Sequence, residues 1–427
     1  MNQPPKSTDA SNHAAQREHY IPLRPADLVQ KLADEPAVTI FEREQFRQLC
    51  QLLEATLHHE YRSRLDELKG AYAPFDPDSD YADQYTLTAD RRASRCRRLF
   101  DRFDALLERA NYRRLSREDL EHALRTPTED GLHLQLDLAI FERLEIYARG
   151  DCQLARTCRS WRTLWRDETK LVPAYRRLAI IFRLKQQTAR THPLDTRAVV
   201  LKLFKNIPRM DVEMLLPGAH VRMGWLEQAK ILLPTLSGVG LTLFKLLQGA
   251  AAVAFVSLYG LLAFLALIGG AVGYGLRSFY GYLRTREKHQ LSLTRSLYFQ
   301  NLDNNAGVLF HLLNEAEEQD FREVALAWWL LWRGGMQQSR ERELDAAAER
   351  WLADRCQLTV DFEVRDALAK LQRLGLAERS PAGRWQAVSI ETALTTLDRV
   401  WDKQFDYQRP DATADEVRPP RIWRAAA

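Results

Sequence analysis

Apolar side chains recur every three or four residues in the first part of the chain. The pattern is clearest from Thr39 to Gly70 and from Arg91 to Ala110, and this spacing is typical of helices with one buried face. Ser116 precedes a third such stretch, with Asp119 at the second position of a capping box. We therefore predict a helical region over residues 20–130.

After residue 130 the apolar residues alternate with polar ones instead. LHLQLDLA (132–139) and RLEIYAR (143–149) alternate, YRRLAIIFRLK (175–185) and AVVLKLFKNIP (198–208) are rich in β-branched and aromatic residues, and HVRM near residue 220 is a fifth candidate. Period two and this composition are typical of β-strands. The segment predicts an antiparallel or mixed sheet in an α+β domain over residues 131–225.

The stretch from Ile231 to Leu276 carries a single charge, Lys245. A charge-free apolar run as long as the one that follows this lysine is typical of a membrane-spanning segment. Gln248-Gly249 offers a turn, and basic residues lie on both flanks, which the positive-inside rule places on the cytoplasmic side. We therefore predict a transmembrane helical hairpin over residues 231–276, in preference to a single crossing.

Beyond the apolar block the helical spacing returns. A long helix is expected to start after Asp303 or Asn304 and to end before Gly334. A helix–helix–hairpin–helix pattern follows, with a Pro-Ala-Gly turn at residues 381–383, and we interpret it as a winged-helix-like domain. The helix expected at residues 362–374 should expose both signs of charge, which argues against nucleic-acid binding. The side chains expected at that surface are Glu363, Arg365, Asp366, Lys370 and Arg373.

Together these patterns predict an α+β membrane protein, with a helical N-terminal region plus a small β-sheet domain, a transmembrane helical hairpin and a C-terminal winged-helix-like domain. Both soluble parts are expected on the cytoplasmic face of a multi-pass protein of a bacterial inner membrane. The remaining predicted segments are a disordered leader without a secretory signal over residues 1–19, a helical and winged-helix-like domain over residues 290–407 with helices at 340–355, 362–374 and 390–405, and a mobile tail over residues 408–427.

Composition adds few constraints. Charged residues make up 28% of the chain but the net charge is only +4, so overall charge does not indicate a nucleic-acid binder. Ten arginines lie between Arg91 and Arg117, for which a solvated helix face is the preferred interpretation and attraction to anionic headgroups the other. The five cysteines are irregularly spaced, which predicts reduced thiols in a reducing compartment rather than a disulfide framework.

Basic residues next to the apolar block form a predicted lipid-contact set, because Lys and Arg near a bilayer attract anionic headgroups. Gly269 and Gly273 within the block are spaced for close helix packing, which predicts a protein partner or a homo-oligomer through the glycine-rich hairpin. The lipid-contact set consists of Lys202, Lys205, Arg209, Arg222, Lys230 and Arg277.

Amide and acid side chains crowd the segment after the block. Helix capping accounts for only one or two of them, and polar groups are costly to order unless each finds a partner. We therefore predict a polar junction that comprises Gln300, Asn301, Asp303, Asn304 and Asn305, of which all but the first are mostly buried.

No nucleophile elbow, phosphate-binding loop or dinucleotide glycine motif is present in the sequence. Two sets of residues have the spacing of metal ligands, but neither completes a motif, and solvated polar faces are the preferred interpretation. We predict no metal and no cofactor, and a non-enzymatic protein in preference to an enzyme. The two sets are Asp76, Asp78 and Asp80 in a loop, and His311, Glu315 and Glu318 on one helix face.

Five runs of the chain resemble a known family. They are REHYIPLRPADLV, LKGAYAPFDPDSD, LKLFKNIPRMDVEMLLPG, SLYFQNLDNNAGVLFHLLNEAEEQDFREVALAW and VDFEVRDALAKLQRLGL. They are similar to domain-of-unknown-function family 3754, to which mitochondrial transmembrane protein 143 also belongs, and the similarity covers residues 18–407. The resemblance implies two adjacent transmembrane helices. It implies no particular enzymatic activity.

These observations predict a membrane-anchored scaffold or interaction protein, with membrane lipids and a further protein as partners. The alternative, based on the lipid-contact set, is anionic-lipid binding or lipid handling. A third hypothesis, based on the two acidic sets, is a metal-dependent enzyme.

Overall fold

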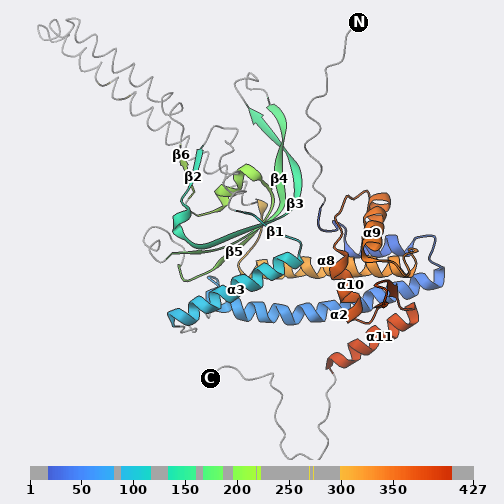
Figure 1. The fold of residues 1–427 in the computed structure, drawn as a ribbon. Coiled ribbons are helices and arrows are strands. Elements are labelled where there is room, and N and C mark those ends of the chain that lie inside the picture. The colour runs from blue at the N-terminus through green and yellow to red at the C-terminus, as the bar shows by residue number, and fades with distance from the viewer. Residues whose placement is uncertain are drawn as a thin grey trace, which may run out of the picture. The chain divides into compact units, whose positions relative to one another are not determined.

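A computed structural model describes residues 18–80, 88–116, 133–159, 167–185, 196–217, 219–222, 269, 273 and 299–405. The chain divides into two compact units, and each combines segments that are far apart in the sequence (Figure 1). Unit 1 consists of Met1–Glu18 and Leu65–Ala316, and unit 2 consists of His19–Arg64 and Glu317–Ala427.

A five-stranded antiparallel sheet forms the centre of unit 1, in the order β1-β3-β4-β5-β7. The α+β class is thereby confirmed, and the edge strands β1 and β7 are additions that no alternating pattern predicted. A separate antiparallel pair joins β2 to β6. The strands are β1 Arg113–Arg114, β2 His133–Leu136, β3 Phe141–Arg159, β4 Asp167–Leu184, β5 Val200–Pro208, β6 Ala219–Arg222 and β7 Asn301–Asn304.

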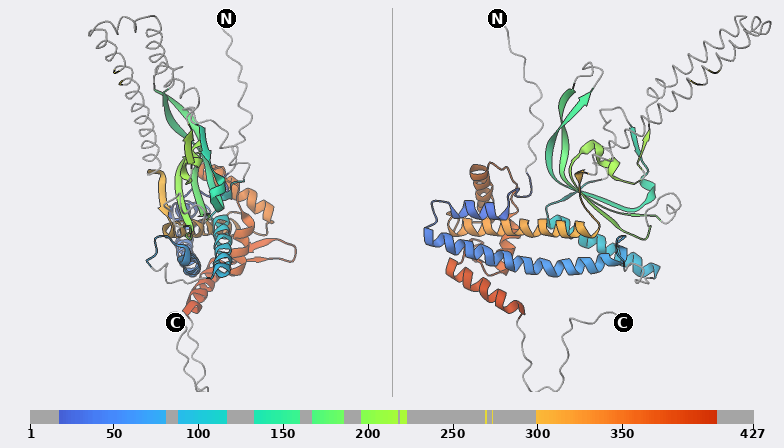
Figure 2. Two further views of the ribbon diagram at one scale, coloured as in Figure 1. Left: turned by 90° about the vertical axis from the view of Figure 1, so that its left-hand side faces the viewer. Right: turned by 180° about the vertical axis from the view of Figure 1, so that it is seen from behind.

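Both faces of this sheet are covered. Alternation along β4 points Leu178 and Phe182 to one face, where they share a core with Val212 of the short 3-10 helix η6. Ile181, fully buried, points to the other face, which the helical segments of unit 1 cover (Figure 2). These elements are η6 Arg209–Leu215, α3 Ala89–Arg109, and the parts within unit 1 of α2 Ile40–Tyr72 and α8 Ala306–Trp332.

Aromatic side chains dominate the core of unit 2. Phe46 stacks on Trp328 and Trp332, with ring centroids 6.1 and 6.0 Å apart. After α8 the elements follow the predicted helix–helix–hairpin–helix order, and Gly383 takes a left-handed conformation in the hairpin turn. They are α9 Glu341–Cys356, α10 Val364–Arg373, β8 Ala377–Arg379, β9 Trp385–Ala387 and α11 Ile390–Asp402, and α1 Pro25–Ala33 also belongs to this unit.

The prediction of a membrane protein is contradicted. Within the described part of the chain, no helix is long and apolar enough to cross a bilayer. α8 has the length, at 27 residues, but acidic and basic side chains interrupt it from Glu315 to Glu323. Of the predicted hairpin over residues 231–276, only Gly269 and Gly273 are among the described residues, and both are helical. We therefore withdraw the transmembrane hairpin, the membrane class and the multi-pass localisation.

Three other predicted segments also fall outside the described residues. They are the helix expected after Ser116, most of the leader over residues 1–19 and the tail over residues 408–427.

Candidate functional site

The carboxylate of Glu315, on α8, lies at the centre of a buried polar cluster in unit 1, which we call the Glu315 centre. It accepts a hydrogen bond from the Tyr112 hydroxyl at 2.6 Å. The guanidinium groups of Arg149, on β3, and Arg177, at the paired position of β4, lie 2.7 and 3.3 Å away. Two strands, one helix and the segment after α3 thus meet at one carboxylate.

The electrostatics of the Glu315 centre are those of a closed ion-pair group. Burial by itself raises the pKa of Glu315, but the contact with His311 and the charge of Arg149 outweigh it and lower the pKa to about 2. Burial, with the nearby Glu315 charge, also raises the pKa of the Tyr112 phenol far above its usual range, although Arg149 opposes this. At neutral pH the carboxylate is therefore an anion between two cations and a neutral phenol, which is how a buried charge is stabilised.

His311 connects the Glu315 centre to β7. Its Nδ1 lies 2.9 Å from Asp303 Oδ2 and its Nε2 lies 3.6 Å from Glu315 Oε1. Hydrogen bonding to Glu315 raises the pKa of His311 against the opposing effect of burial. Gly307 leaves room for the Asp303 carboxylate, because a Cβ at this position would lie 2.8 Å from Asp303 Oδ1. Since both ring nitrogens face carboxylates, His311 acts as a positively charged bridge.

Asn305 is the one member of the predicted polar junction that is buried. Its side chain donates to Asp78 Oδ2 at 2.6 Å and accepts from the Leu201 amide and the Tyr72 hydroxyl, each at 3.3 Å. Its φ of 48° is left-handed, a conformation that asparagine tolerates better than most residues. The structure therefore brings the predicted junction and the acidic loop 76–80 together.

The rest of the predicted junction is more open than expected. Asn301 and Asp303 are half-buried as part of the edge strand β7, and Asn304 is exposed, so the prediction of burial is wrong for Asn304. Gln300 Nε2 donates to the Asn206 carbonyl at 3.0 Å. A strand alternates its side chains between two faces, so neighbouring amides in β7 cannot all enter one interior.

We expect Asn305→Ala to lower the free energy of unfolding by about 1–3 kcal/mol, because it leaves the buried partners unsatisfied. Asn304→Ala should change it by less than about 0.5 kcal/mol. Thermal and urea denaturation of the purified chain would measure both. Asn305→Gly keeps the left-handed backbone accessible and loses only the side-chain bonds, so a stable glycine variant would trace the effect to backbone conformation instead.

Among the predicted lipid-contact residues whose side chains the structure describes, Lys202 and Lys205 do not lie on one surface. Lys202 and Lys205 are three residues apart on β5, so their side chains project from opposite faces. Burial lowers the pKa of Lys202, and Arg209 pairs with an aspartate of β3 at 2.8 Å. Of the other members, Arg222 ends β6, whereas Lys230 and Arg277 lie outside the described residues.

Residues of both predicted metal-binding sets make ion pairs or hydrogen bonds with other residues. His311 and Glu315 belong to the Glu315 centre, whereas Glu318 belongs to unit 2, where it accepts from Arg322 at 3.1 Å. In the acidic loop, Asp76 accepts from the Asp78 amide at 3.1 Å and thus closes a turn. Neither set converges on a common point among the described residues.

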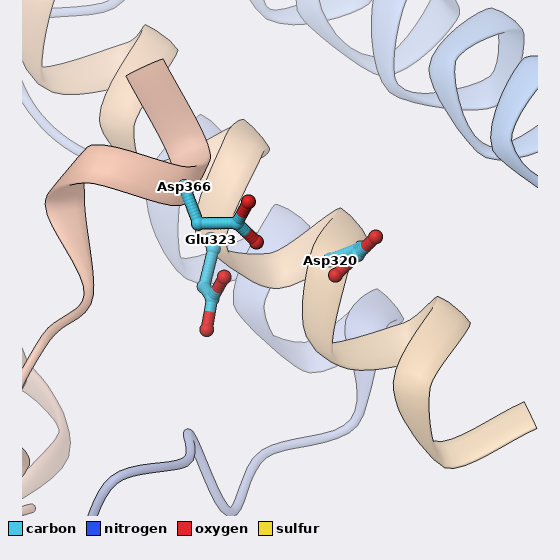
Figure 3. Close-up of side chains that lie close together, drawn as sticks. All are labelled: Asp320, Glu323 and Asp366. Carbon is cyan, nitrogen blue, oxygen red and sulfur yellow. The ribbon is translucent and has the colours of Figure 1, made fainter. Parts of the chain in front are cut away.

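A second charged centre in unit 2 was missed by sequence reasoning. The carboxylates of Asp320 and Glu323 on α8 and of Asp366 on α10 gather within 4.8 Å of one another (Figure 3). Lys370 Nζ lies 2.6 Å from Asp320 and 4.0 Å from Glu323, and also pairs with Asp366 one turn earlier. We call this group the Lys370 centre. Its ammonium takes the place that a metal ion would otherwise occupy.

The Lys370 centre is enclosed by further hydrogen bonds. The Tyr61 hydroxyl donates to Asp320 at 2.6 Å, and Gln319 donates to Glu323 at 2.6 Å. Burial lowers the pKa of Lys370, but the three carboxylates, Asp320 first, outweigh it and raise the pKa. Lys370 is buried, so the prediction that it is exposed is wrong. The signal available in the sequence was the charged run EAEEQDFRE (315–323) within α8.

Glu323→Gln should be tolerated and should stabilise unit 2 at alkaline pH. Burial raises the pKa of Glu323 to about 8, although Lys370 opposes this. The folded protein therefore retains a proton that the unfolded chain releases near pH 4.5, so wild-type stability falls as the pH rises towards 8. Glutamine keeps the bond to Gln319 without this penalty. Urea denaturation at pH 6 and pH 9 would measure the difference in stability between the variant and the wild type. A variant less stable than wild type at pH 9 would contradict the raised pKa of Glu323.

Comparison with protein-family models gives a match. The model of the family DUF3754, described as a protein of unknown function, matches residues 175–307. This range covers most of β4, all of β5 and β7, and the junction residues Asp303 and Asn305. The resemblance read from the sequence motifs is thus confirmed, while the likeness to mitochondrial transmembrane protein 143 stays a prediction. No solved structure matches the chain.

Proposed function

Residues 175–307 match the model of the DUF3754 family, whose function is unknown. We propose from the structure alone that this chain is a non-enzymatic interaction protein that binds an extended segment of another protein. The single observation that supports this proposal is the outer part of the β3–β4 pair. The Glu315 and Lys370 centres support it indirectly, because their charges are satisfied internally and stabilise the fold.

β3 and β4 continue beyond the sheet as a two-stranded ribbon. Pairing between β4 and β5 ends at Ala174, and β1 pairs with β3 only at Tyr147 and Ala148. Pairing of β3 with β4 continues to Arg159 and Asp167 (Figure 1). Among the described residues no further strand borders residues 153–159 or 167–173. An open strand edge presents unpaired backbone groups, to which another strand can add.

One face of the ribbon is exposed and partly apolar. Gln153, Ala155, Leu171 and Pro173 share this face, and Leu171 is 66% exposed. Proline has no N–H to donate, so β3 is the better of the two edges for strand addition. The β3 edge carries Arg156 and Arg159 in sequence, which disfavours antiparallel pairing with a second copy and favours a neutral or acidic segment of a different protein.

A photo-cross-linking amino acid at position 171 would test the proposal in cells that express the chain. We expect a discrete cross-linked product from position 171 and none from position 93, an exposed alanine of α3. In the recovered complex, the amides of residues 153–155 should exchange hydrogen more slowly than in the free protein. Equal products from both positions, or unchanged exchange along β3, would overturn the proposal.

The described residues give the other two hypotheses less support. Lys202 and Lys205 project from opposite faces of β5, and Glu315 and Asp76 of the predicted metal sets serve in an ion pair and a turn.

A further inference from the structure

One flank of α3 carries a row of exposed arginines. Arg91, Arg95, Arg98, Arg102 and Arg109 follow one another at intervals of four, three, four and seven residues, and all are exposed. These intervals place them on one side of the helix. The row is about 27 Å long, at about 1.5 Å per residue. The exposed Ala105 stands at the one turn without an arginine.

Two acids of α3, Asp101 and Asp104, lie on the other flank of the helix and contact the sheet. Asp104 accepts a hydrogen bond from the hydroxyl of Tyr147 on β3 at 2.8 Å. Asp101 lies 3.9 Å from Arg143, which is also on β3. On the side of the row, Arg102 lies 3.9 Å from Glu67 of α2. No ion pair or hydrogen bond from the described residues reaches the side chains of Arg91, Arg95 or Arg109. At Arg91, Arg95 and Arg109 the row is therefore a positive surface that no described acid neutralises, whereas Arg102 is partly neutralised by Glu67.

Such a row has an energetic cost to the isolated chain. Arg91 and Arg95, Arg95 and Arg98, and Arg98 and Arg102 are spaced so that their side chains meet, and like charges at this spacing destabilise a helix. An oppositely charged partner removes that repulsion. We propose that the arginine row of α3 is a docking site for an acidic helix of a partner protein.

The geometry favours a helix over a nucleic acid. Carboxylates at positions i, i+4, i+7 and i+11 of a helix recur once per turn of about 5.4 Å and match the row in register. Guanidinium groups bind carboxylates with two parallel hydrogen bonds. Phosphates recur every 3.4 Å or so along each strand of a duplex, and the width of a duplex would bring it against the exposed Asp66 and Glu67 of α2. A slender acidic helix matches the spacing of the row and meets the acids of α2 only at Arg102, which lies beside Glu67.

The test uses the whole chain and two fluorescent helical peptides of identical composition. One carries glutamates at i, i+4, i+7 and i+11, and the other carries them in scrambled positions. Fluorescence anisotropy should show that the spaced peptide binds about tenfold more tightly than the scrambled one, with an affinity that falls as salt is added.

Charge reversals inside and outside the row distinguish binding at the row from a general electrostatic attraction between the peptide and the protein. The double variant Arg95→Glu/Arg98→Glu should weaken binding of the spaced peptide by about tenfold or more, whereas Arg97→Glu, an exposed reversal on the other flank of α3, should change it by less than about threefold. A peptide with lysines in place of the glutamates should bind the double variant better than the wild type.

Three results would overturn the proposal: equal binding of the spaced and scrambled peptides, an equal loss in Arg97→Glu, or tighter binding of a short RNA or DNA duplex that the double variant abolishes. The last would identify a nucleic-acid surface instead. The row and the β3–β4 ribbon are separate surfaces, so failure of either proposal leaves the other standing.

Discussion

Lys370→Met is expected to lower the free energy of unfolding by about 3–5 kcal/mol, the typical effect of breaking a buried ion pair by removing one partner. Methionine fills a similar volume, so the loss would come from charge rather than from packing. Asp320 and Glu323 are almost fully buried and would face each other and Asp366 without the ammonium. Urea denaturation followed by circular dichroism would measure the change.

Lys403→Met provides the control, because Lys403 is exposed in the same unit. This substitution should change stability by less than about 0.5 kcal/mol. If the charge argument is correct, millimolar calcium should recover part of the stability of Lys370→Met, since three carboxylates within 4.8 Å then lack a cation. Equal stability of the two methionine variants would show that Lys370 does not hold the centre together.

Glu315→Gln is expected to produce a loss of similar size, about 3–5 kcal/mol, because two guanidinium groups lose their counter-charge. Arg149 is the more deeply buried of the two, with 8% of its side chain exposed. Glutamine can still accept from Tyr112, so the variant removes charge and little else. Glu318→Gln is the matched control, because its pair with Arg322 leaves the carboxylate 41% exposed, and exposed pairs contribute less than about 1 kcal/mol.

The pH dependence of these variants gives an independent check. The pKa of Glu315 in the folded chain is about 2, below its ordinary value of 4.5. Its contribution is therefore complete above pH 4.5 and is lost as the pH falls towards 2. The stability difference between wild type and Glu315→Gln should shrink over that interval. A difference that stays constant from pH 7 to pH 2.5 would mean that the ion pairs do not account for the loss.

His311 is expected to act in the opposite direction. Its pKa is raised in the folded protein, so its stabilising contribution is present below pH 6.5 and declines as the pH rises through the folded value. Loss of the Glu315 charge thus limits the stability of the Glu315 centre at acidic pH, and loss of the His311 charge limits it at alkaline pH.

Local periodicity was enough to locate most of the elements. The helices expected at 39–70 and 91–110 are α2 and α3, and the strand expected at 198–208 is β5. The C-terminal order of helices and hairpin was also correct. These elements have one buried face, and the spacing of apolar residues along an amphipathic segment reports that face directly.

The tertiary structure decided what the polar residues do. β7 is polar and became a strand because β5 offers it backbone partners, and β3 and β4 extend past their apolar cores because each supplies the other's hydrogen bonds. Periodicity also predicted that Lys370 lies on an exposed face, but its side chain is buried in an ion pair with Asp320 of α8.

The sequence by itself determined the spacing of apolar residues, and with it the helices, the strands and the α+β class. The absence of a spanning helix among the described residues, the left-handed role of Asn305 and the two charged centres were decided only by the tertiary structure. The physical reason is the distance along the chain between the residues that decide each feature. Burial of one face is a property of neighbouring residues, whereas an ion pair such as Arg149 with Glu315 depends on sheet register and helix rotation across more than a hundred residues of intervening chain.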